Sequence, residues 1–390
     1  MFLSPADEYF THQTALTHAM VATSDPSWRE RYWVSFQDTE TGDTVLTLGL
    51  GRYPNQDVME AFACFSSGGE QTNVRLSRSL LPQSHEMTVG DFACEIVEPM
   101  RTLRFTLGDN DSGLSFDITF AATFEPILEG RFFQISRARA TYDAIRYVQH
   151  GRASGWIRTP SGESIEVTPE RWWCERDHSW GTRPLPRAEG QPPGERPEWK
   201  MLLFAPLQLP DFAVHLYLQE SEPGRPVYLS AGIAAGLDSD GEVPVIVGVD
   251  HDLEWEKDAA APTLVGGQVR LTLHGGETID LQLTARPARA HLRGGGYEGW
   301  NGWKQGNWRG ELTAEHDTWD LRDRSNFYRY AKAGSDHLVE VRHNDSVGYG
   351  IVEYMVLPGY GRYGEALPPN RPEALPPSRP EALPPARPKA

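Results

Sequence analysis

Hydrophobic residues along most of this chain recur in short segments separated by turn residues, a pattern typical of β-strands. Residues 114–120 (LSFDITF) are the clearest case, because Leu, Phe or Ile at every second position alternates with Ser, Asp or Thr. Such alternation predicts a strand with one buried and one hydrated face. Segments rich in aromatic and β-branched residues predict further strands at residues 31–37, 44–50, 58–65, 103–107, 212–220, 243–249, 268–273, 278–283 and 350–356.

Signals for other secondary structure are few. One helical period over residues 8–20 predicts a short N-terminal helix, which Ser24-Asp25-Pro26 would end. Because almost no helices are available to make crossovers, the strands favour antiparallel barrels or sandwiches. We therefore predict an all-β protein with two consecutive antiparallel barrels.

A proline-rich segment divides the chain. Residues 184–197 (PLPRAEGQPPGERP) contain five prolines, so this stretch cannot be a central strand. We predict an N-terminal extension at 1–24, a first barrel at 25–185, a linker at 186–197 and a second barrel at 198–364.

The end of the chain is a repeat. Residues 365–390 contain the unit EALPPxRP three times and have almost nothing that could form a core. We predict a disordered, solvated polyproline-II tail. Weak docking of this tail to an SH3-like partner is the alternative.

Composition limits the function classes. The chain has 37 Lys and Arg against 54 Asp and Glu, and its net charge of −17 argues against a nucleic-acid partner. Its start lacks the basic and apolar regions of a signal peptide, and no apolar stretch approaches the about 18 residues of a transmembrane helix. Cys64, Cys94 and Cys174 lack CxxC spacing, which fits reduced thiols. We expect a cytoplasmic protein with no transmembrane segment.

No motif indicates a cofactor. Gly294-Gly295-Gly296 lacks the strand–helix context and the further glycine and lysine of a phosphate loop. The 12 histidines are scattered without HExxH spacing. We therefore expect neither a bound metal ion nor a nucleotide cofactor.

Residues 171–183 (RWWCERDHSWGTR) carry the most chemistry. If this segment is extended, Trp173, Glu175, Asp177 and Ser179 share one face, and Trp172, Cys174, Arg176, His178 and Trp180 share the other. A carboxyl group among indoles loses hydration, so Asp177 could stay protonated and act as a general acid. Equally, Asp177 could be an ionised partner of Arg176 or Arg183 in a structural ion pair. A nucleophilic Cys174 is a weaker idea.

A second aromatic concentration lies at residues 294–319. It holds Tyr297, Trp300 and Trp303 among glycines, a composition that could form the rim of a pocket for an apolar or sugar-like ligand. Core and turn packing is the alternative for these side chains. Glu298 and Glu315 are the carboxylates that a carbohydrate-active site would need there.

The run Asp177-His178-Ser179-Trp180-Gly181 with Arg183, preceded by residues 151–158 (GRASGWIR) and 116–120 (FDITF), resembles the superfamily of carotenoid 1,2-hydratases and AttH-like proteins. The resemblance implies two consecutive lipocalin-like barrels and an elongated hydrophobic site at or between them. Enzymes of that superfamily include hydratases of isoprenoid and flavonoid-type alkenes and fungal cyclases of the Diels–Alder type.

We therefore expect a cofactor-independent hydratase or dehydratase of a terpenoid, steroid or polyketide alkene, with isomerisation or cyclisation as variants. In this hypothesis Asp177 donates the proton and His178 orients it or positions water. The substrate would contact Trp173, Trp180, Tyr297, Trp300 and Trp303. Two alternatives stay open: a lipid-binding or carrier protein without catalysis, and a carbohydrate-active β protein.

Overall fold

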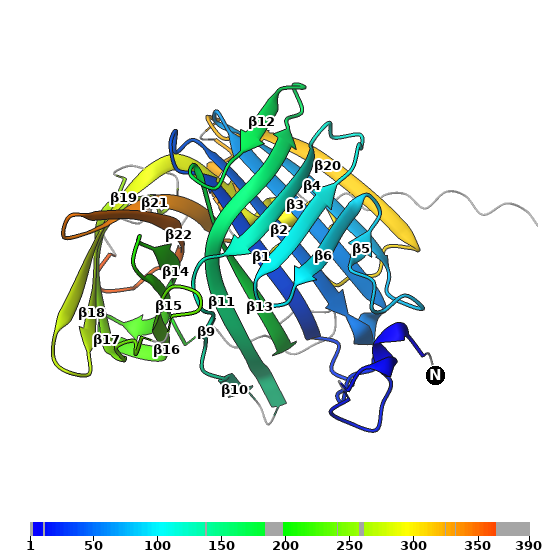
Figure 1. Ribbon diagram of the computed structural model, residues 1–390, viewed down its shortest axis with the longest axis horizontal. Helices are drawn as coiled ribbons and strands as arrows, with labels where there is room; N and C mark the ends of the chain where they lie inside the picture. The colour runs from blue at the N-terminus through cyan, green and yellow to red at the C-terminus, as the bar shows by residue number, and fades with distance from the viewer. Residues whose placement is uncertain are drawn as a thin grey trace, which may run out of the picture.

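The computed structural model describes residues 3–10, 12–136, 139–183, 198–239, 241–256, 261–323, 325–331 and 333–363. Within them the chain forms two nearly closed antiparallel barrels that lie side by side (Figure 1). The predicted all-β, two-barrel fold is thus confirmed. The expected linker and Pro-rich tail lie outside the described residues.

The first barrel is built from a 14-stranded sheet with the order β20-β4-β3-β2-β1-β13-β11-β8-β7-β6-β5, in which β9, β10 and β12 pair with β11. It comes close to closure where β5 lies against β3 and β4. Its strands are β1 (Trp28–Asp38), β2 (Thr44–Tyr53), β3 (Val58–Ser67), β4 (Glu70–Ser79), β5 (Thr88–Val89), β6 (Phe92–Glu98), β7 (Thr102–Leu107), β8 (Ser115–Ala122), β9 (Ile127–Leu128), β10 (Phe132–Ser136), β11 (Arg139–Arg158), β12 (Ser164–Val167), β13 (Trp172–Thr182) and β20 (Leu312–Asp320).

The second barrel is an eight-stranded sheet with the order β16-β15-β14-β22-β21-β19-β18-β17, and β16 approaches β17 where it closes. Its strands are β14 (Met201–Gln208), β15 (Ala213–Glu222), β16 (Arg225–Ala234), β17 (Ile246–Trp255), β18 (Leu264–Leu273), β19 (Thr278–His291), β21 (Ser335–His343) and β22 (Ser346–Val356). The helices are η1 (Pro5–Glu8), η2 (Pro54–Gln56), η3 (Leu292–Gly295) and α1 (Phe327–Ala331). None of the helices in the described ranges is long and apolar enough to cross a membrane.

One strand crosses from the second half of the chain to the first barrel. β20 follows β19 in the sequence but pairs with β4 along its whole length, from Leu312 against Arg78 to Asp320 against Glu70. Residues 312–320, expected within the second barrel, therefore form an edge strand of the first. A local sequence pattern cannot identify a partner strand that lies far away in the sequence.

The N-terminal helix is shorter and earlier than expected. It is a single 3-10 turn, η1, and the described residues of 9–20 form bends and turns. The Asp7 carboxylate accepts hydrogen bonds from the backbone N–H groups of Ser4 (2.7 Å) and His18 (2.6 Å) and contacts the His12 ring at 2.9 Å. These contacts fold the segment back on itself, so the helical pattern is not realised.

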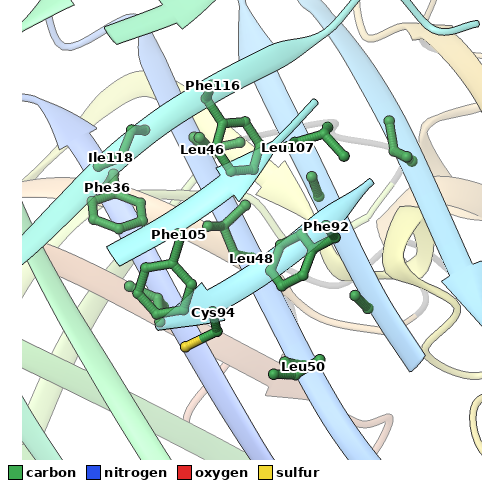
Figure 2. Packing of buried hydrophobic residues seen from close by; sticks show 14 of the residues in the cluster. Phe36, Leu46, Leu48, Leu50, Phe92, Cys94, Phe105, Leu107, Phe116 and Ile118 are labelled. Carbon is green, nitrogen blue, oxygen red and sulfur yellow. The ribbon is translucent and has the colours of Figure 1, made fainter. Parts of the chain in front are cut away.

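The interior of the first barrel is filled by its own side chains. Figure 2 shows Phe36, Phe92, Phe105 and Phe116 packed with leucines from β2 and β7. Phe36 and Phe105 meet edge to face with ring centroids 6.1 Å apart. The second barrel has a separate apolar core. The first barrel is therefore a packed core in this region, as in other small barrels whose interior side chains fill the lumen.

A third apolar cluster joins the two barrels. It contains Trp33, Phe62 and Val148 from the outer face of the first barrel and Phe204 and Ile351 from the second. β19 packs against β2 and β3, β14 against β11, and β22 against β13. Because this outer face is covered, β1, β2 and β3 are buried on both faces.

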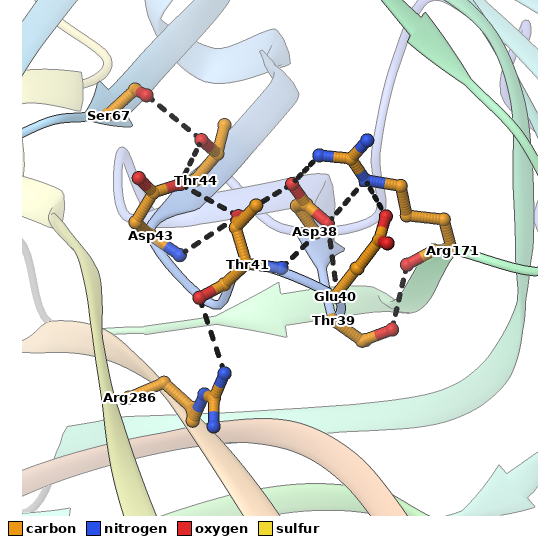
Figure 3. Close-up of polar contacts among 9 residues, drawn as sticks. All are labelled: Asp38, Thr39, Glu40, Thr41, Asp43, Thr44, Ser67, Arg171 and Arg286. Carbon is orange, nitrogen blue, oxygen red and sulfur yellow. Dashed lines mark hydrogen bonds and ion pairs between the residues drawn. The ribbon is translucent and has the colours of Figure 1, made fainter.

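A polar cluster ties one end of the barrels together (Figure 3). Arg171 donates two hydrogen bonds to Asp38 at the end of β1, at 2.7 and 2.5 Å. Arg286 of β19 donates a hydrogen bond to the backbone oxygen of Thr41 in the β1–β2 turn at 3.2 Å. The Arg171–Asp38 contact fixes the end of the first barrel, and the Arg286 contact helps to hold the second barrel against it.

Candidate functional site

Strand β13 carries the predicted motif and separates two environments. Trp172 and Cys174 lie in the apolar core of the first barrel. Trp173 points the other way and meets Tyr349 of β22 at a ring-centroid distance of 5.3 Å. The predicted alternation is confirmed, so Glu175, Asp177 and Ser179 face the second barrel.

Asp177 lies buried between the barrels. Its Oδ2 is 3.5 Å from Nε of Arg146 on β11, and its side chain is 10% exposed. Arg146 also approaches Glu129 at 3.6 Å, and its guanidinium carbon lies 5.0 Å from the ring centroid of Phe204. Asp177 is thus ion-paired, as in the second of the two alternatives, but with Arg146 instead of Arg176 or Arg183.

His178 lies on the opposite face of β13. Its ring stacks on Tyr32 at 4.2 Å, and its Nε2 is 3.1 Å from Oε1 of Glu30. Burial acts to raise the pKa of Glu30, but the hydrogen bond with His178 and the charge of Arg52 lower it to about 2. The expectation that His178 orients Asp177 is not met by this geometry, because successive side chains of a strand point to opposite faces.

Trp180 shares the face of His178, with ring centroids 5.4 Å apart. Together with Trp28 and Ile145 it lines a groove of about 550 Å³ beside the N-terminal segment. Trp173 and Trp180, both expected to contact the substrate, therefore lie on opposite faces of β13.

The structure brings two further acids to the inter-barrel face. Asp336 of β21 and Glu353 of β22 are directly paired neighbours in the sheet. Oδ2 of Asp336 accepts hydrogen bonds from Trp33 Nε1 (2.9 Å) and Thr47 Oγ1 (3.1 Å), and its Oδ1 is buried without a hydrogen-bond partner. In the sequence, Asp336 is recognisable only as an acid near the start of an apolar strand, and Glu353 only as an acid within one.

The surroundings favour the neutral form of these acids. Burial, and then the charge of Glu353, raise the pKa of Asp336 well above its usual range. Burial raises the pKa of Glu353 to about 7, with Arg146 opposing the shift and Asp177 adding to it. Two carboxyl groups that disfavour each other's charge tend to share one proton. Glu353 is therefore suited to proton transfer near neutral pH.

Glu175 extends this line of acids. It is fully buried beside Gln37, and neither of its oxygens makes a regular hydrogen bond. Burial raises its pKa well above the usual range, which favours its neutral form. Glu175, Asp177 and Asp336, which are buried, and the half-buried Glu353 thus form an acidic cluster between the two barrels.

Of the predicted aromatic ligands in residues 294–319, only Tyr297 reaches this region. Its hydroxyl accepts a hydrogen bond from Nη2 of Arg31 at 2.8 Å. Burial raises its pKa, the Arg31 charge opposes the shift, and the charge of Asp177 adds to it.

Trp300 and Trp303 pack within their own loop. Their backbones hydrogen-bond to each other (2.9 and 2.7 Å), and Trp300 donates from Nε1 to Asp317 at 2.6 Å. Trp300 and Trp319 have ring centroids 4.6 Å apart, and Trp303 is 2% exposed. The structure therefore shows core and turn packing for these two residues, which was the alternative to a pocket rim. Glu298 is exposed, and Glu315 is ion-paired with Arg309.

Within the described ranges no group of three His, Cys, Asp or Glu side chains could hold a metal ion. Cys174 is fully buried, and burial raises its pKa well above the usual range. A buried thiol of this kind is unsuited to nucleophilic attack.

A family model described as "Family of unknown function (DUF8625)" matches residues 3–366. The chain belongs to this family. No protein of curated function matches it by sequence.

Three solved structures match this chain in structure. One, named as a candidate AttH from Nitrosomonas europaea, has a TM-score of 0.54 and 15% identity over 86% of this chain and 94% of its own. Kievitone hydratase from Nectria haematococca has a TM-score of 0.47 and 12% identity, over 84% of this chain and 88% of its own. For CghA the TM-score is 0.43 and the identity 12%, over 85% of this chain and 89% of its own. The first likeness supports, at the level of fold, the resemblance that the residues around Asp177 suggested.

Proposed function

We propose that this protein is a cofactor-independent hydratase-type enzyme. It adds water to, or removes water from, a carbon–carbon double bond of a hydrophobic small molecule bound between the two barrels. The observation that carries the proposal is the neighbouring pair Asp336 and Glu353, because the pKa of Glu353 is raised to about 7. The resemblance of residues 177–181 to a superfamily with hydratases agrees with it.

In this proposal Glu353 is the proton donor. Its side chain is half-buried, whereas Asp336 is fully buried, so Glu353 is the more accessible of the two acids. Glu353 donates its proton to one alkene carbon, a water oxygen bonds to the other carbon, and the surplus proton of that water returns to Glu353. Dehydration is the reverse sequence, and isomerisation or cyclisation would begin with the same proton transfer.

Asp336 and Asp177 tune this acid in the proposal. Neutral Asp336 can hydrogen-bond to Glu353 after the latter loses its proton, which stabilises the carboxylate. Asp177, paired with Arg146, adds negative charge that keeps the pKa of Glu353 high. The role of proton donor that the sequence suggested for Asp177 thus passes to Glu353, and Asp177 becomes a positioning residue.

The test is oxygen incorporation from labelled water. A panel of terpenoid, steroid and polyketide alkenes is incubated with the full chain in H₂¹⁸O, and hydrated products are detected by mass spectrometry. We expect Glu353→Gln to lower the rate of ¹⁸O incorporation by about 10²–10⁴-fold, because an amide cannot deliver the proton. The exposed Glu254→Gln on β17 is the matched control and should keep the wild-type rate. A folded Glu353→Gln protein with an unchanged rate would contradict the assignment.

A further inference from the structure

On the face of β13 that carries its odd-numbered residues, small side chains lie next to arginines of the neighbouring strands. Ser179 is the direct sheet neighbour of Arg31 on β1 and of Arg146 on β11. Gly181, the next residue on this face, lies opposite Arg29 on one side and Ala144 on the other. Arg183 follows on the same face, with its guanidinium carbon 5.7 Å from the ring centroid of Tyr142. Four guanidinium groups therefore gather at one end of the inter-barrel face, in a protein whose net charge is −17.

Three of these four arginines form no ion pair with a carboxylate among the described residues. Only Arg146 does, with Asp177 and Glu129. Arg31 donates to the neutral groups Tyr297 (2.8 Å) and Gln305 (3.1 Å). The Nε atoms of Arg29, Arg31 and Arg183 are buried without a hydrogen-bond partner.

Nearby acids compensate this positive charge only in part: burial opposes the charge of Arg31, and Glu60 and Asp177 raise its pKa without forming an ion pair with it. Glu60 lies within electrostatic reach of Arg29 and Arg31, but its oxygens accept hydrogen bonds from Tyr53 (2.6 Å) and from the Gly306 N–H (2.9 Å). Burial, with the charges of Arg31 and Arg183, lowers the pKa of Arg29 to about 10. Guanidinium groups that are removed from water and placed close together repel each other unless an anion joins them.

We propose that this cluster, Arg29, Arg31, Arg146 and Arg183, binds an oxyanion carried by the hydrophobic substrate. The inference rests on the proposed function and specifies its substrate class: an apolar molecule with a carboxylate, enolate or phosphate group. Arginine suits this task because its planar fork of N–H donors matches the two oxygens of a carboxylate or phosphate. Arg146 and Arg183 also act on the charge of Glu353. The anion would therefore be anchored next to the proposed proton donor.

The test compares three probes with the same apolar chain: octanoate, octyl phosphate and 1-octanol. We expect the full-length wild-type protein to bind at least one anion about tenfold or more tightly than the alcohol in calorimetry. The relative affinities of octanoate and octyl phosphate then distinguish a carboxylate from a phosphate ligand. Equal affinity for the three probes, including no measurable binding of any, overturns the proposal.

The arginine variant separates binding from structure. We expect Arg29→Gln with Arg183→Gln to remove the preference for the anions while the melting temperature stays equal or rises, because two unpaired charges are gone. Arg270→Gln, an exposed partner of Asp280 on β18, is the control and should keep the preference. If the double variant does not fold, Arg183→Gln alone tests the same point, since Arg183 lies beyond the end of β13. A double variant that keeps the full preference contradicts the proposal.

Failure of this inference can be told apart from failure of the proposed function. Glu353→Gln should still prefer the anionic probes even though it loses ¹⁸O incorporation. An enzyme whose hydration depends on Glu353 but which binds octanol as well as octanoate would refute only the anion site. Anion preference without any effect of Glu353→Gln on hydration would refute only the proton donor.

Discussion

On one face of β13, Trp172 and Cys174 are buried among the apolar side chains of the first barrel, whereas on the other face Glu175 and Asp177 are buried among polar and charged ones. Both faces exclude water, but only the side chains of the first face are apolar and need no hydrogen bonds. Burying polar groups is costly unless they are paired, and Glu175 and Oδ1 of Asp336 are not. Such groups are concentrated at functional sites.

The difference changes the expected location of the ligand. A lipocalin-like barrel suggests a cup that holds the ligand inside, but here phenylalanines fill the first barrel (Figure 2). The titratable groups lie outside this barrel, where the second barrel covers them. The packing of the first barrel therefore disfavours the lipid-carrier alternative in its usual form, with the ligand inside that barrel.

The largest stability effect should come from the interior. Phe105 is 1% exposed, and Phe105→Ala should lower the free energy of unfolding by about 3–5 kcal/mol, since it removes buried contacts and leaves a cavity. Denaturant unfolding measures this. Phe133→Ala on β10, where the side chain is 48% exposed, is the control and should change stability by about 0.5 kcal/mol or less. If Phe105→Ala lowers the free energy of unfolding by less than about 1 kcal/mol, the interior is loosely packed, which would favour the carrier alternative.

A smaller effect should come from the ion pair on the other face. Asp177→Asn should cost about 1.5–3 kcal/mol, because Arg146 loses one charged partner but keeps Glu129. Urea unfolding and ¹⁸O incorporation are measured on the same sample. The exposed Asp252→Asn on β17 serves as control.

This variant also compares the two candidate proton donors. If Asp177→Asn leaves stability unchanged and lowers the hydration rate as much as Glu353→Gln does, Asp177 is the donor that the motif suggested. A destabilised Asp177→Asn protein that keeps most of its rate per folded molecule supports Glu353.

The alternation within β8 and β13 could be predicted from the sequence because side chains in a strand have a fixed period of two. What each face contacts could not be predicted, because the period of two does not show which face meets the second barrel. The same limit applies to β20, whose pairing with β4 joins segments that are far apart in the sequence. Fold class follows from local patterns, whereas these contacts are long-range.

The candidate site was predicted only in part for a related reason. Asp177 and Tyr297 were found through a motif and an aromatic cluster, and both lie on the inter-barrel face. Asp336 and Glu353 belong to no motif, and their signal was only an acid in an apolar strand, such as IVEYMV around Glu353. Arg29 and Arg31 resemble ordinary exposed positions of a strand. Arg29 is half-buried, and Arg31 is buried where it donates hydrogen bonds to Tyr297 and Gln305, which lie far away in the sequence and which no local pattern identifies.

The smallest effect, a pH dependence of stability, tests the acids of the inter-barrel face directly. Glu353 has a pKa of about 7 in the folded state, against about 4.3 for a glutamate in an unfolded chain. Between these values the folded state holds a proton that the unfolded state has lost, so this group makes stability fall as pH rises from about 4.3 to 7. Because the side chain is half-buried, water screens part of the effect, and we expect about 1 kcal/mol between about pH 5 and pH 7.5. Glu353→Gln cannot ionise, so its unfolding free energy should fall less over this range, whereas Glu254→Gln should follow the wild type. Parallel curves for Glu353→Gln and the wild type would show that Glu353 does not titrate near neutral pH, and the inter-barrel face would then lack the acid that distinguishes it chemically from the barrel interior.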